Sequence, residues 1–293
     1  IALGVAALII VLSVMNGFQK EVRDRMLAVI AHVEVRALGD AALPDWRLTA
    51  AKARQHPQVI GAAPFVAAQA LIAQGEQMRG TLVRGISPDD EASVTDLAAK
   101  LRGTVLTRLQ PGAWGVVLGG ELARSLGVRE GDKVALIAPG GQVTPAGVIP
   151  RLKQLTVVGT FDSGHYEYDA GLALMQLDDA ARLFRVEGPT GVQLRLKDVH
   201  AARGVAEELS KSLGKAVEVR DWTRSNRNWF DAVQIEKRMM FIILTLIVAV
   251  AAFNLVSTLV MTVTDKRADI AILRTLGASP RSVMGIFMVQ GAA

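Results

Sequence analysis

Apolar and polar positions divide the chain into charge-free stretches at its two ends and a long mixed block between them. Residues 239–264 are 26 consecutive positions without a charged side chain. A helix of that length measures about 39 Å, more than the roughly 30 Å of a bilayer's hydrocarbon core. Residues 1–18 are also uncharged, and a third apolar run begins near Val283. We therefore predict transmembrane helices at 1–18 and 239–264 and the start of a third at 283–293.

The first apolar stretch has two interpretations. A signal peptide contains about 7 to 15 apolar residues after a basic segment and before a small-residue cleavage site. The stretch at 1–18 is longer and shows neither flanking feature, which favours a transmembrane helix. Because the sequence begins at Ile1 and ends inside an apolar run, we also expect it to be a fragment.

The charges after the second apolar stretch predict the orientation. The short loop 265–282 contains Lys266, Arg267, Arg274 and Arg281, and an excess of basic residues marks cytoplasmic loops. The block 19–238 is then outside the cytoplasm. It holds 29 basic and 26 acidic residues, a net charge of +3, which a long translocated domain can carry.

Within the block, alternating apolar positions predict strands and apolar positions three to four apart predict helices. The expected strands are 33–37, 63–73, 78–86, 114–118, 133–138, 152–161, 171–176, 191–196 and 216–219. The expected helices are 42–55, 91–101, 120–126, 177–184 and 200–213, with helical extensions of the membrane helices at 18–30 and 225–238. This mixture predicts an α+β domain carried on helical stalks.

Composition and motifs exclude several classes of chemistry. The chain has no cysteine, which excludes disulfides and thiolate sites. It has no G-x-x-x-x-G-K-[ST] motif, so ATP binding through a Walker A loop must come from another protein, and it has no H-E-x-x-H or G-x-S-x-G motif. No basic run is interleaved with aromatic residues, which argues against a nucleic-acid partner. We expect no catalytic residue, metal or cofactor on this chain.

The richest polar cluster is DSGHYEYD, with Asp162, His165, Glu167 and Asp169. These side chains could offer oxygen and imidazole ligands to a metal ion. A connection between strands also needs turn and solvated residues, and we favour that interpretation.

A proline- and glycine-rich stretch, PGGQVTPAGVIPR, lies at 139–151 between two expected strands. Pro139, Pro145 and Pro150 stiffen it, which lowers the entropy lost on docking, and it carries apolar residues. The stretch is either an ordinary surface loop or a projecting arm that binds a partner.

The cytoplasmic loop has a helical pattern of its own. Ile270, Leu273 and Leu276 lie three residues apart, Gly277 stands where a helix would end, and Pro280 lies just beyond it. These residues predict a short helix, which either lies in the membrane interface or docks into a groove of a cytoplasmic partner.

The two ends of the sequence carry a family resemblance. IALGVAALIIVLSVMNGFQKEV at 1–22 and FNLVSTLVMTVTDKRADIAILRTLGAS at 253–279 resemble the lipoprotein-releasing permeases of the LolC/LolE family, which are mechanotransmission permeases of the MacB/FtsX type. The resemblance implies a multi-pass protein of the bacterial inner membrane with a large periplasmic domain. That domain would combine a Porter-like part, about 31–106 and 189–224, with a Sabre-like insertion at about 107–188.

The resemblance also implies a function and partners. The chain would be a permease subunit that works with a LolD-like ATPase, which binds ATP and Mg²⁺, and with a second LolC/LolE-type permease subunit. Together they would extract lipoprotein cargo from the membrane lipid and pass it to a LolA-like periplasmic carrier. The implied carrier-binding hook is Gln142, Val143, Thr144, Pro145, Ala146, Gly147, Val148, Ile149, Pro150 and Arg151. The implied ATPase-coupling residues are Asp269, Ile270, Ile272, Leu273, Arg274, Leu276 and Gly277.

Several alternatives stay open. The subunit could be of the LolC type, the LolE type or a single hook-bearing LolF type, and its permease partner could be identical or different. A MacB-like or FtsX-like relative would use the same architecture for efflux or to control a periplasmic hydrolase. A membrane-anchored periplasmic enzyme would need a clustered catalytic set, which the sequence does not show.

Overall fold

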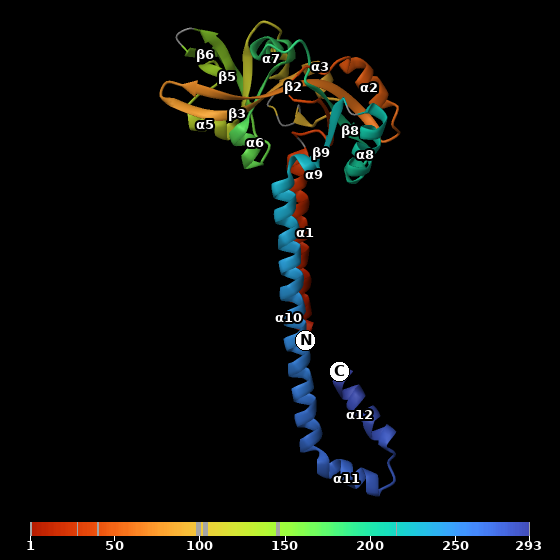
Figure 1. Cartoon of the computed structure of the whole chain (residues 1–293). Helices are drawn as coiled ribbons and strands as arrows, with labels where there is room; N and C mark the ends of the chain where they lie inside the picture. Colours follow the sequence, from red (N-terminus) through yellow and green to blue (C-terminus); the bar gives the residue numbers. More distant parts are fainter. Residues whose placement is uncertain are drawn as a thin grey trace. The chain divides into compact units, whose positions relative to one another are not determined.

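The computed structural model describes residues 2–27, 29–39, 41–97, 101, 105–144, 147–214 and 216–292 (Figure 1). The chain divides into two compact units. One, the helical unit, comprises Ile1–Asn16 and Asn228–Ala293, and the other, the sheet unit, comprises Gly17–Arg227.

The helical unit is built from one long apolar helix and shorter helices. Helix α1 (Ala2–Leu27) begins in it, and α10 (Arg227–Asp265), α11 (Arg267–Thr275) and α12 (Pro280–Ala292) follow one another at the other end of the chain. In the part of the chain that the structure describes, one helix is long and apolar enough to cross a membrane: Asp231–Asp265, which contains an 18-residue window with a mean hydropathy of 2.7. The predicted second membrane helix, 239–264, lies inside it. Residues 2–18 are helical within α1, and their membrane-spanning role stays a prediction.

The predicted helical extensions are correct in kind and wrong at their ends. Helix α1 ends at Leu27 rather than Ile30, and the backbone N–H groups of Val29 and Ile30 both donate to the Met26 carbonyl. The extension before α10 is not continuous from Ser225. Asn226 interrupts it, since the Asn226 side-chain amide donates to the Trp222 carbonyl at 2.9 Å and competes with the helix backbone.

The described residues of the sheet unit form one sheet of nine strands, in the order β3-β7-β4-β6-β5-β2-β8-β1-β9. A further pairing of β3 with β2 closes six of these strands into a ring, β2-β3-β7-β4-β6-β5. The strands are β1 (Val33–Ala37), β2 (Val59–Gln74), β3 (Gln77–Ile86), β4 (Gly115–Gly119), β5 (Lys133–Thr144), β6 (Gly147–Phe161), β7 (Leu172–Gln176), β8 (Gly191–Leu196) and β9 (Val217–Asp221).

Strand β2 belongs to the ring and also joins it to the remaining strands of the sheet, β8, β1 and β9. One edge pairs with β3 along Phe65–Gln74. The other edge pairs first with β8, from Val59 to Phe65, and then with β5, from Leu71 to Ala73. The ring therefore contains strands from both of the sequence segments that we expected to form separate parts.

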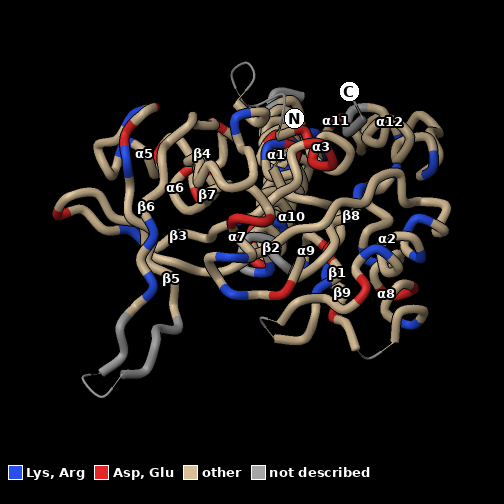
Figure 2. Tube along the Cα trace, turned by 90° about the horizontal axis from the view of Figure 1, so that it is seen from above, with Lys and Arg blue, Asp and Glu red and all other residues tan. Residues whose placement is uncertain are grey.

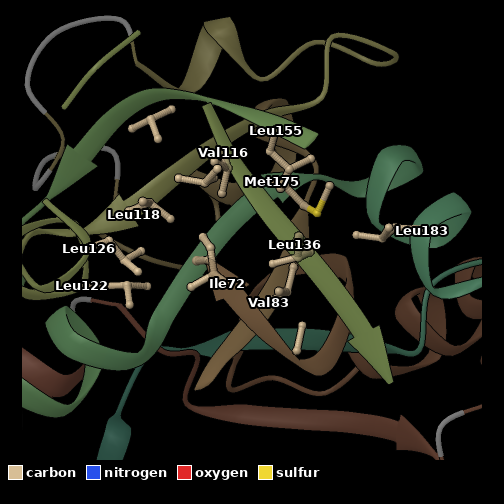
Figure 3. Packing of buried hydrophobic residues seen from close by; sticks show 14 of the residues in the cluster. Ile72, Val83, Val116, Leu118, Leu122, Leu126, Leu136, Leu155, Met175 and Leu183 are labelled. Atoms are coloured by element: carbon tan, nitrogen blue, oxygen red, sulfur yellow. The ribbon is translucent and has the colours of Figure 1, made fainter. Parts of the chain in front are cut away.

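Apolar side chains fill the ring because alternate residues of each strand point inward. Ile72, Val83, Leu136 and Met175 come from four different strands and meet in this core (Figure 3). Helices α5 (Gly120–Leu126) and α7 (Leu177–Phe184) add side chains to it. A second core, which includes Val29, Leu97, Val105, Phe161 and Leu174, contains residues of β4, β6 and β7 that alternate with the ring core.

The remaining helices are α2 (Trp46–Arg54), α3 (Pro88–Glu91), α6 (Tyr166–Gly171), α8 (Ala202–Leu213) and α9 (Trp222–Ser225), with 3₁₀ turns at Leu106–Arg108 and Val199–Ala201. The predicted helix 42–55 begins later, at Trp46, after Pro44 and after Asp45, whose φ is 46°. The prediction of a helix at 91–101 is wrong for residues 92–96, which are not helical. The helix α3 lies earlier in the chain and ends at Glu91, because Pro88 favours the first turn of a helix. Residues 98–100 lie outside the described residues.

Gly119, at the end of β4, allows α6 to approach the ring closely. A Cβ at this position would lie 2.3 Å from the Asp169 carbonyl oxygen, so the backbone would have to move. We expect Gly119→Ala to lower the free energy of unfolding of the sheet unit by about 1–3 kcal/mol, measured by urea denaturation. Gly80→Ala is the matched control, because a Cβ there meets nothing within 4 Å. Equal effects of the two substitutions would contradict this role of Gly119.

Candidate functional site

The predicted hook forms the end of a β-hairpin. Strand β5 continues to Thr144 and β6 begins at Gly147, with the pairs Gln142–Ile149, Val143–Val148 and Thr144–Gly147. The prediction of a loop between strands ending at Ala138 and beginning at Leu152 was therefore wrong for this backbone. Pro145 and Ala146 lie outside the described residues. Main-chain pairing gives the described part of the arm an extended form.

A bulge separates the arm from the ring. Ala138 pairs with Arg151 and Gln142 pairs with Ile149, so three residues of β5, Pro139 to Gly141, oppose Pro150 alone. Neither proline can donate a backbone hydrogen bond, and bulges bend a strand. The ring's pairing of β5 with β2 ends at Ile137. Beyond that point, the described pairs of β5 and β6 join only these two strands, which makes the arm a two-stranded projection.

The base of the arm is anchored to the sheet unit. Arg151, the last residue of the predicted hook, is half-buried, and its Nη1 donates to the Phe184 carbonyl at the end of α7 at 3.4 Å. Lys153 Nζ lies 4.0 Å from the centre of the Trp114 ring. Arg151 therefore belongs to the base rather than to the projecting hairpin.

An apolar groove of about 840 Å³ lies beside the base of the arm. Leu71 and Leu82 are each more than 40% exposed there, although both are large apolar side chains. Large exposed apolar patches mark binding surfaces. The groove is lined by Gln69, Ala70, Leu71, Gly80, Thr81, Leu82, Ile137, Ala138, Pro139, Pro150 and Gly171, a set without a charged residue.

The predicted coupling residues lie on and just after α11. The helix covers Asp269, Ile270, Ile272, Leu273 and Arg274, while Leu276 and Gly277 follow its last residue, Thr275. Gly277 has φ 98°, a conformation that glycine adopts easily, and this explains why the helix stops there. Leu276 is 80% exposed. The structure thus supplies the predicted helix and its end, and its docking partner stays a prediction.

In the polar cluster DSGHYEYD, a carboxylate side chain bonds to neighbouring groups of the same segment. The buried Asp169 carboxylate accepts hydrogen bonds from the Ser163 amide at 2.8 Å, the Ser163 hydroxyl at 2.7 Å and the Gly164 amide at 3.1 Å. These bonds favour the turn interpretation over the metal-site interpretation. Within the described ranges, no group of three or more His, Asp or Glu side chains is placed to hold a metal ion.

A buried charge cluster that we did not anticipate connects five elements, β1, β2, β3, α3 and β8. Arg84 of β3 forms an ion pair with Glu34 of β1 and lies 4.9 Å from the centre of the Phe65 ring. Glu91, in α3, accepts hydrogen bonds from Thr95 at 2.7 Å and from Gln193 of β8 at 2.6 Å. Burial raises the pKa of Glu91 and lowers the pKa of Arg84, and the attraction between them opposes both shifts.

Basic and acidic residues are interspersed along the Cα trace (Figure 2). A positively charged stripe is the usual mark of a nucleic-acid-binding surface. Several of the described charges are instead paired within the sheet unit, as in Arg195–Asp96 and Arg220–Glu218. Candidate binding surfaces are therefore the arm, the apolar groove and α11.

Comparisons with family models and with known proteins indicate the same family. Residues 1–212 match the model of the MacB-like periplasmic core domain, and residues 241–293 match the model of the FtsX-like permease C-terminal region. The lipoprotein-releasing system transmembrane protein LolC of Neisseria meningitidis serogroup B is 52% identical over 100% of this chain and 71% of the relative. LolE of Haemophilus influenzae is 31% identical over 99% of this chain and 71% of the relative.

Among solved structures, the periplasmic region of MacB from Actinobacillus actinomycetemcomitans covers 72% of this chain and 98% of that chain, with 9% identity and a TM-score of 0.42. The matches to the curated relatives and to the family models extend over both the sheet unit and the helical unit. The chain therefore belongs to the LolC/LolE family of lipoprotein-releasing system transmembrane proteins, with a MacB-like α+β periplasmic domain and an FtsX-like permease region.

Proposed function

We propose that this chain is the permease subunit of an ATP-driven transporter that releases lipoproteins from the inner membrane and passes them to a periplasmic carrier. The observation that carries this proposal is 52% identity, over the whole chain, to a lipoprotein-releasing transmembrane protein. The arm at the end of β5 and β6 supports it, because a release system needs a surface that receives the acceptor of the cargo.

The chain crosses the inner membrane more than once in this proposal. Helix α10 contains the span Asp231–Asp265, and the basic loop after it places the sheet unit in the periplasm. The first apolar stretch and α12 supply further spans, which are shorter or lie partly outside the described side chains. The permease acts beside a second LolC/LolE-type subunit, identical or different.

ATP hydrolysis takes place on a separate LolD-like ATPase in this proposal. The chain lacks a Walker A motif, so it binds neither ATP nor Mg²⁺ through such a loop. The exposed apolar residues of α11, Ile272 and Leu273, with Leu276 just beyond it, suit a helix that docks into a groove of that ATPase.

The arm binds a LolA-like carrier in this proposal. Among the described pairs of residues 142–149, the two strands pair only with each other, so their outer backbone edges can bind a partner strand, and the prolines of the stretch 139–151 lower the entropy lost on docking. The apolar groove lies at the base of the same hairpin, where Pro139 and Pro150 line it. Lipid-linked cargo and its acceptor would thus meet at one end of the ring.

Removal of the arm tests the proposal. We expect a chain without Gln142–Ile149, closed by an Asn-Gly turn, to lose at least about tenfold in affinity for the carrier, because the deletion removes the projecting hairpin and leaves the ring's pairs in place. The measurement is carrier capture by the purified transporter.

The matched control changes another exposed hairpin end. Met78→Ser, next to the β2–β3 turn, alters an exposed apolar residue without touching the arm. Carrier capture that survives the deletion, with thermal unfolding unchanged, would remove the arm from the carrier interface. Equal losses in the deletion and in the Met78→Ser control would show that capture depends on general surface properties instead.

A further inference from the structure

The segment that joins β6 to β7 contacts α1 and the residue that immediately precedes α10. It comprises Asp162 to Gly171 and includes α6. One of its residues lies against the last turns of α1, and another bonds to the residue that immediately precedes α10. We call it the joint segment.

The joint segment is fixed to the ring at two points. The Asp169 backbone packs against Gly119 at the end of β4, at a distance that leaves no room for a Cβ. The Thr81 hydroxyl of β3 donates to the Gly171 carbonyl at 3.1 Å. Both contacts are to ring strands, so α6 can move only with the ring.

The segment is also rigid within itself. The Asp169 carboxylate holds the backbone of Ser163 and Gly164, as described above, and Gly164 has φ 74°. The Ser163 hydroxyl accepts a hydrogen bond from the His165 amide at 3.0 Å. A displacement at one end of the segment is therefore transmitted to the other rather than absorbed by it.

The first helix contact is a hydrogen bond at the break before α10. The Tyr168 hydroxyl donates to Asn226 Oδ1 at 2.8 Å, and Asn226 Nδ2 donates to the Trp222 carbonyl at 2.9 Å. Each end of the Asn226 amide thus has a partner of the right polarity. Burial raises the pKa of Tyr168 to about 12, so its hydroxyl keeps its proton at neutral pH and can donate it to Asn226 Oδ1.

The second contact is at the end of α1. Arg25 Nη1 lies 3.5 Å from the Gly164 carbonyl oxygen, and its guanidinium passes within 3.0 Å of the place where a Gly164 Cβ would be. Arg25 is held in turn by Glu21 one turn earlier, at 2.9 Å. The contact is long for a hydrogen bond, and its main effect is close packing of the guanidinium on the loop.

We propose that Tyr168 and Asn226 are positioning residues that lock the start of α10 to the ring, so that a displacement of α10 moves the arm. The physical connection runs from Asn226 to Tyr168 in α6, through Gly119 to β4, and from β4 to its partner β6, which carries the arm. This inference rests on the proposed function, because it assigns to that function the contact that conveys movement to the carrier-binding end.

The test uses the complete transporter complex and a label that needs no cargo. The chain contains no cysteine, so Leu152→Cys, an exposed position near the base of the arm, can carry a single environment-sensitive fluorophore on this subunit. The measured quantity is the change in its fluorescence on ATP binding. We expect Tyr168→Phe, which removes only the hydroxyl, to reduce this change about fivefold while ATP hydrolysis continues.

Tyr166→Phe is the matched control, since Tyr166 lies on the same helix and is 75% exposed. We expect it to leave the change intact. Asn226→Leu should reproduce the effect of Tyr168→Phe, and the double variant should be no worse than either single variant, because both remove one shared contact. A purely structural role would instead lower the melting temperature and ATP hydrolysis together and would give additive effects.

Three results would overturn the inference: an unchanged signal in Tyr168→Phe, equal losses in both tyrosine variants, or additive effects in the double variant. Lipoprotein release is measured in parallel. If the fluorescence responds as expected while the unmodified complex releases no lipoprotein, the joint stands and the proposed function fails. If lipoprotein is released and the fluorescence change is the same in Tyr168→Phe, the proposed function is supported and the role of the joint segment is contradicted.

Discussion

Arg84→Met is expected to destabilise the sheet unit by about 3–5 kcal/mol at neutral pH. Arg84 is buried and pairs with Glu34, and its charge also attracts Glu91. Removing one partner of a buried ion pair leaves the remaining charge without compensation in a medium of low polarity. Methionine keeps much of the side-chain volume, so the effect reports the lost charge and its stacking on Phe65 rather than a cavity. Urea unfolding of Gly17–Arg227 measures the loss.

Glu91→Gln is the matched comparison. The amide keeps a polar side chain near Thr95 and Gln193 while removing a charge whose burial is unfavourable. Because folding raises the pKa of Glu91, its contribution to stability is complete below the unfolded pKa and is lost as pH rises through the folded pKa. We therefore expect Glu91→Gln to cost little at neutral pH and to flatten the pH dependence of stability in the interval above about pH 4.5. If Arg84→Met lowers the free energy of unfolding by less than about 1 kcal/mol, the ion pair is not important for stability.

Leu273→Glu is expected to abolish coupling to the ATPase. Leu273 lies three residues from Ile270 and from Leu276, on the apolar stripe of α11. A charge placed in a buried apolar contact costs several kcal/mol, so affinity for the ATPase should fall by roughly a hundredfold. The measurements are co-purification with the ATPase and ATP-dependent lipoprotein release.

Ala271→Glu introduces the same charge elsewhere on α11. Residues two apart face nearly opposite sides of a helix, so Ala271 lies away from Leu273, and glutamate is a good helix former in both variants. We expect this control to retain binding and release. If both variants lose binding and release equally, α11 has no specific docking face. If both retain them equally, α11 is a helix that lies in the membrane interface and does not dock.

Local patterns in the sequence predicted individual elements well. The strands at Val33–Ala37 and Gly191–Leu196 and the helices at Gly120–Leu126 and Leu177–Phe184 have the predicted bounds. Their signals are local, because alternation or helical spacing is complete within a few residues. Among the errors, the helix before α10 breaks at Asn226, whose side chain bonds to the Trp222 carbonyl, and α1 ends at Leu27 although the apolar pattern continues to Ile30.

The closed ring could not be predicted from such patterns. Its closure depends on β2 pairing with β3 on one edge and with β5 on the other, and the β2–β5 pairs join residues more than 60 positions apart, such as Leu71 and Ile137. The strand QMRGTLVRGI also looks like a surface strand, yet Arg84 within it is buried because Glu34 and Phe65 lie across from it. Within it, Arg84 stands among the apolar or small residues of LVRGI, which was the available signal.

The candidate sites were predicted to different extents. Composition marked the stretch 139–151 as unusual, and the structure showed that its described backbone is a hairpin whose base includes Arg151. No sequence pattern indicated the contact between Tyr168 and Asn226, which are 58 residues apart. DSGHYEYD attracted attention for its possible ligands, whereas its observed contacts position neighbouring elements.

The most direct test of the proposed function is lipoprotein release from proteoliposomes that contain the complete transporter with this subunit. We predict that, with ATP and Mg²⁺ and the soluble carrier present, lipoprotein appears in the soluble fraction bound to the carrier, and that removal of the arm or of ATP prevents this. ATP hydrolysis at a normal rate with all lipoprotein left in the membrane would contradict the proposal and favour an efflux or hydrolase-controlling permease instead.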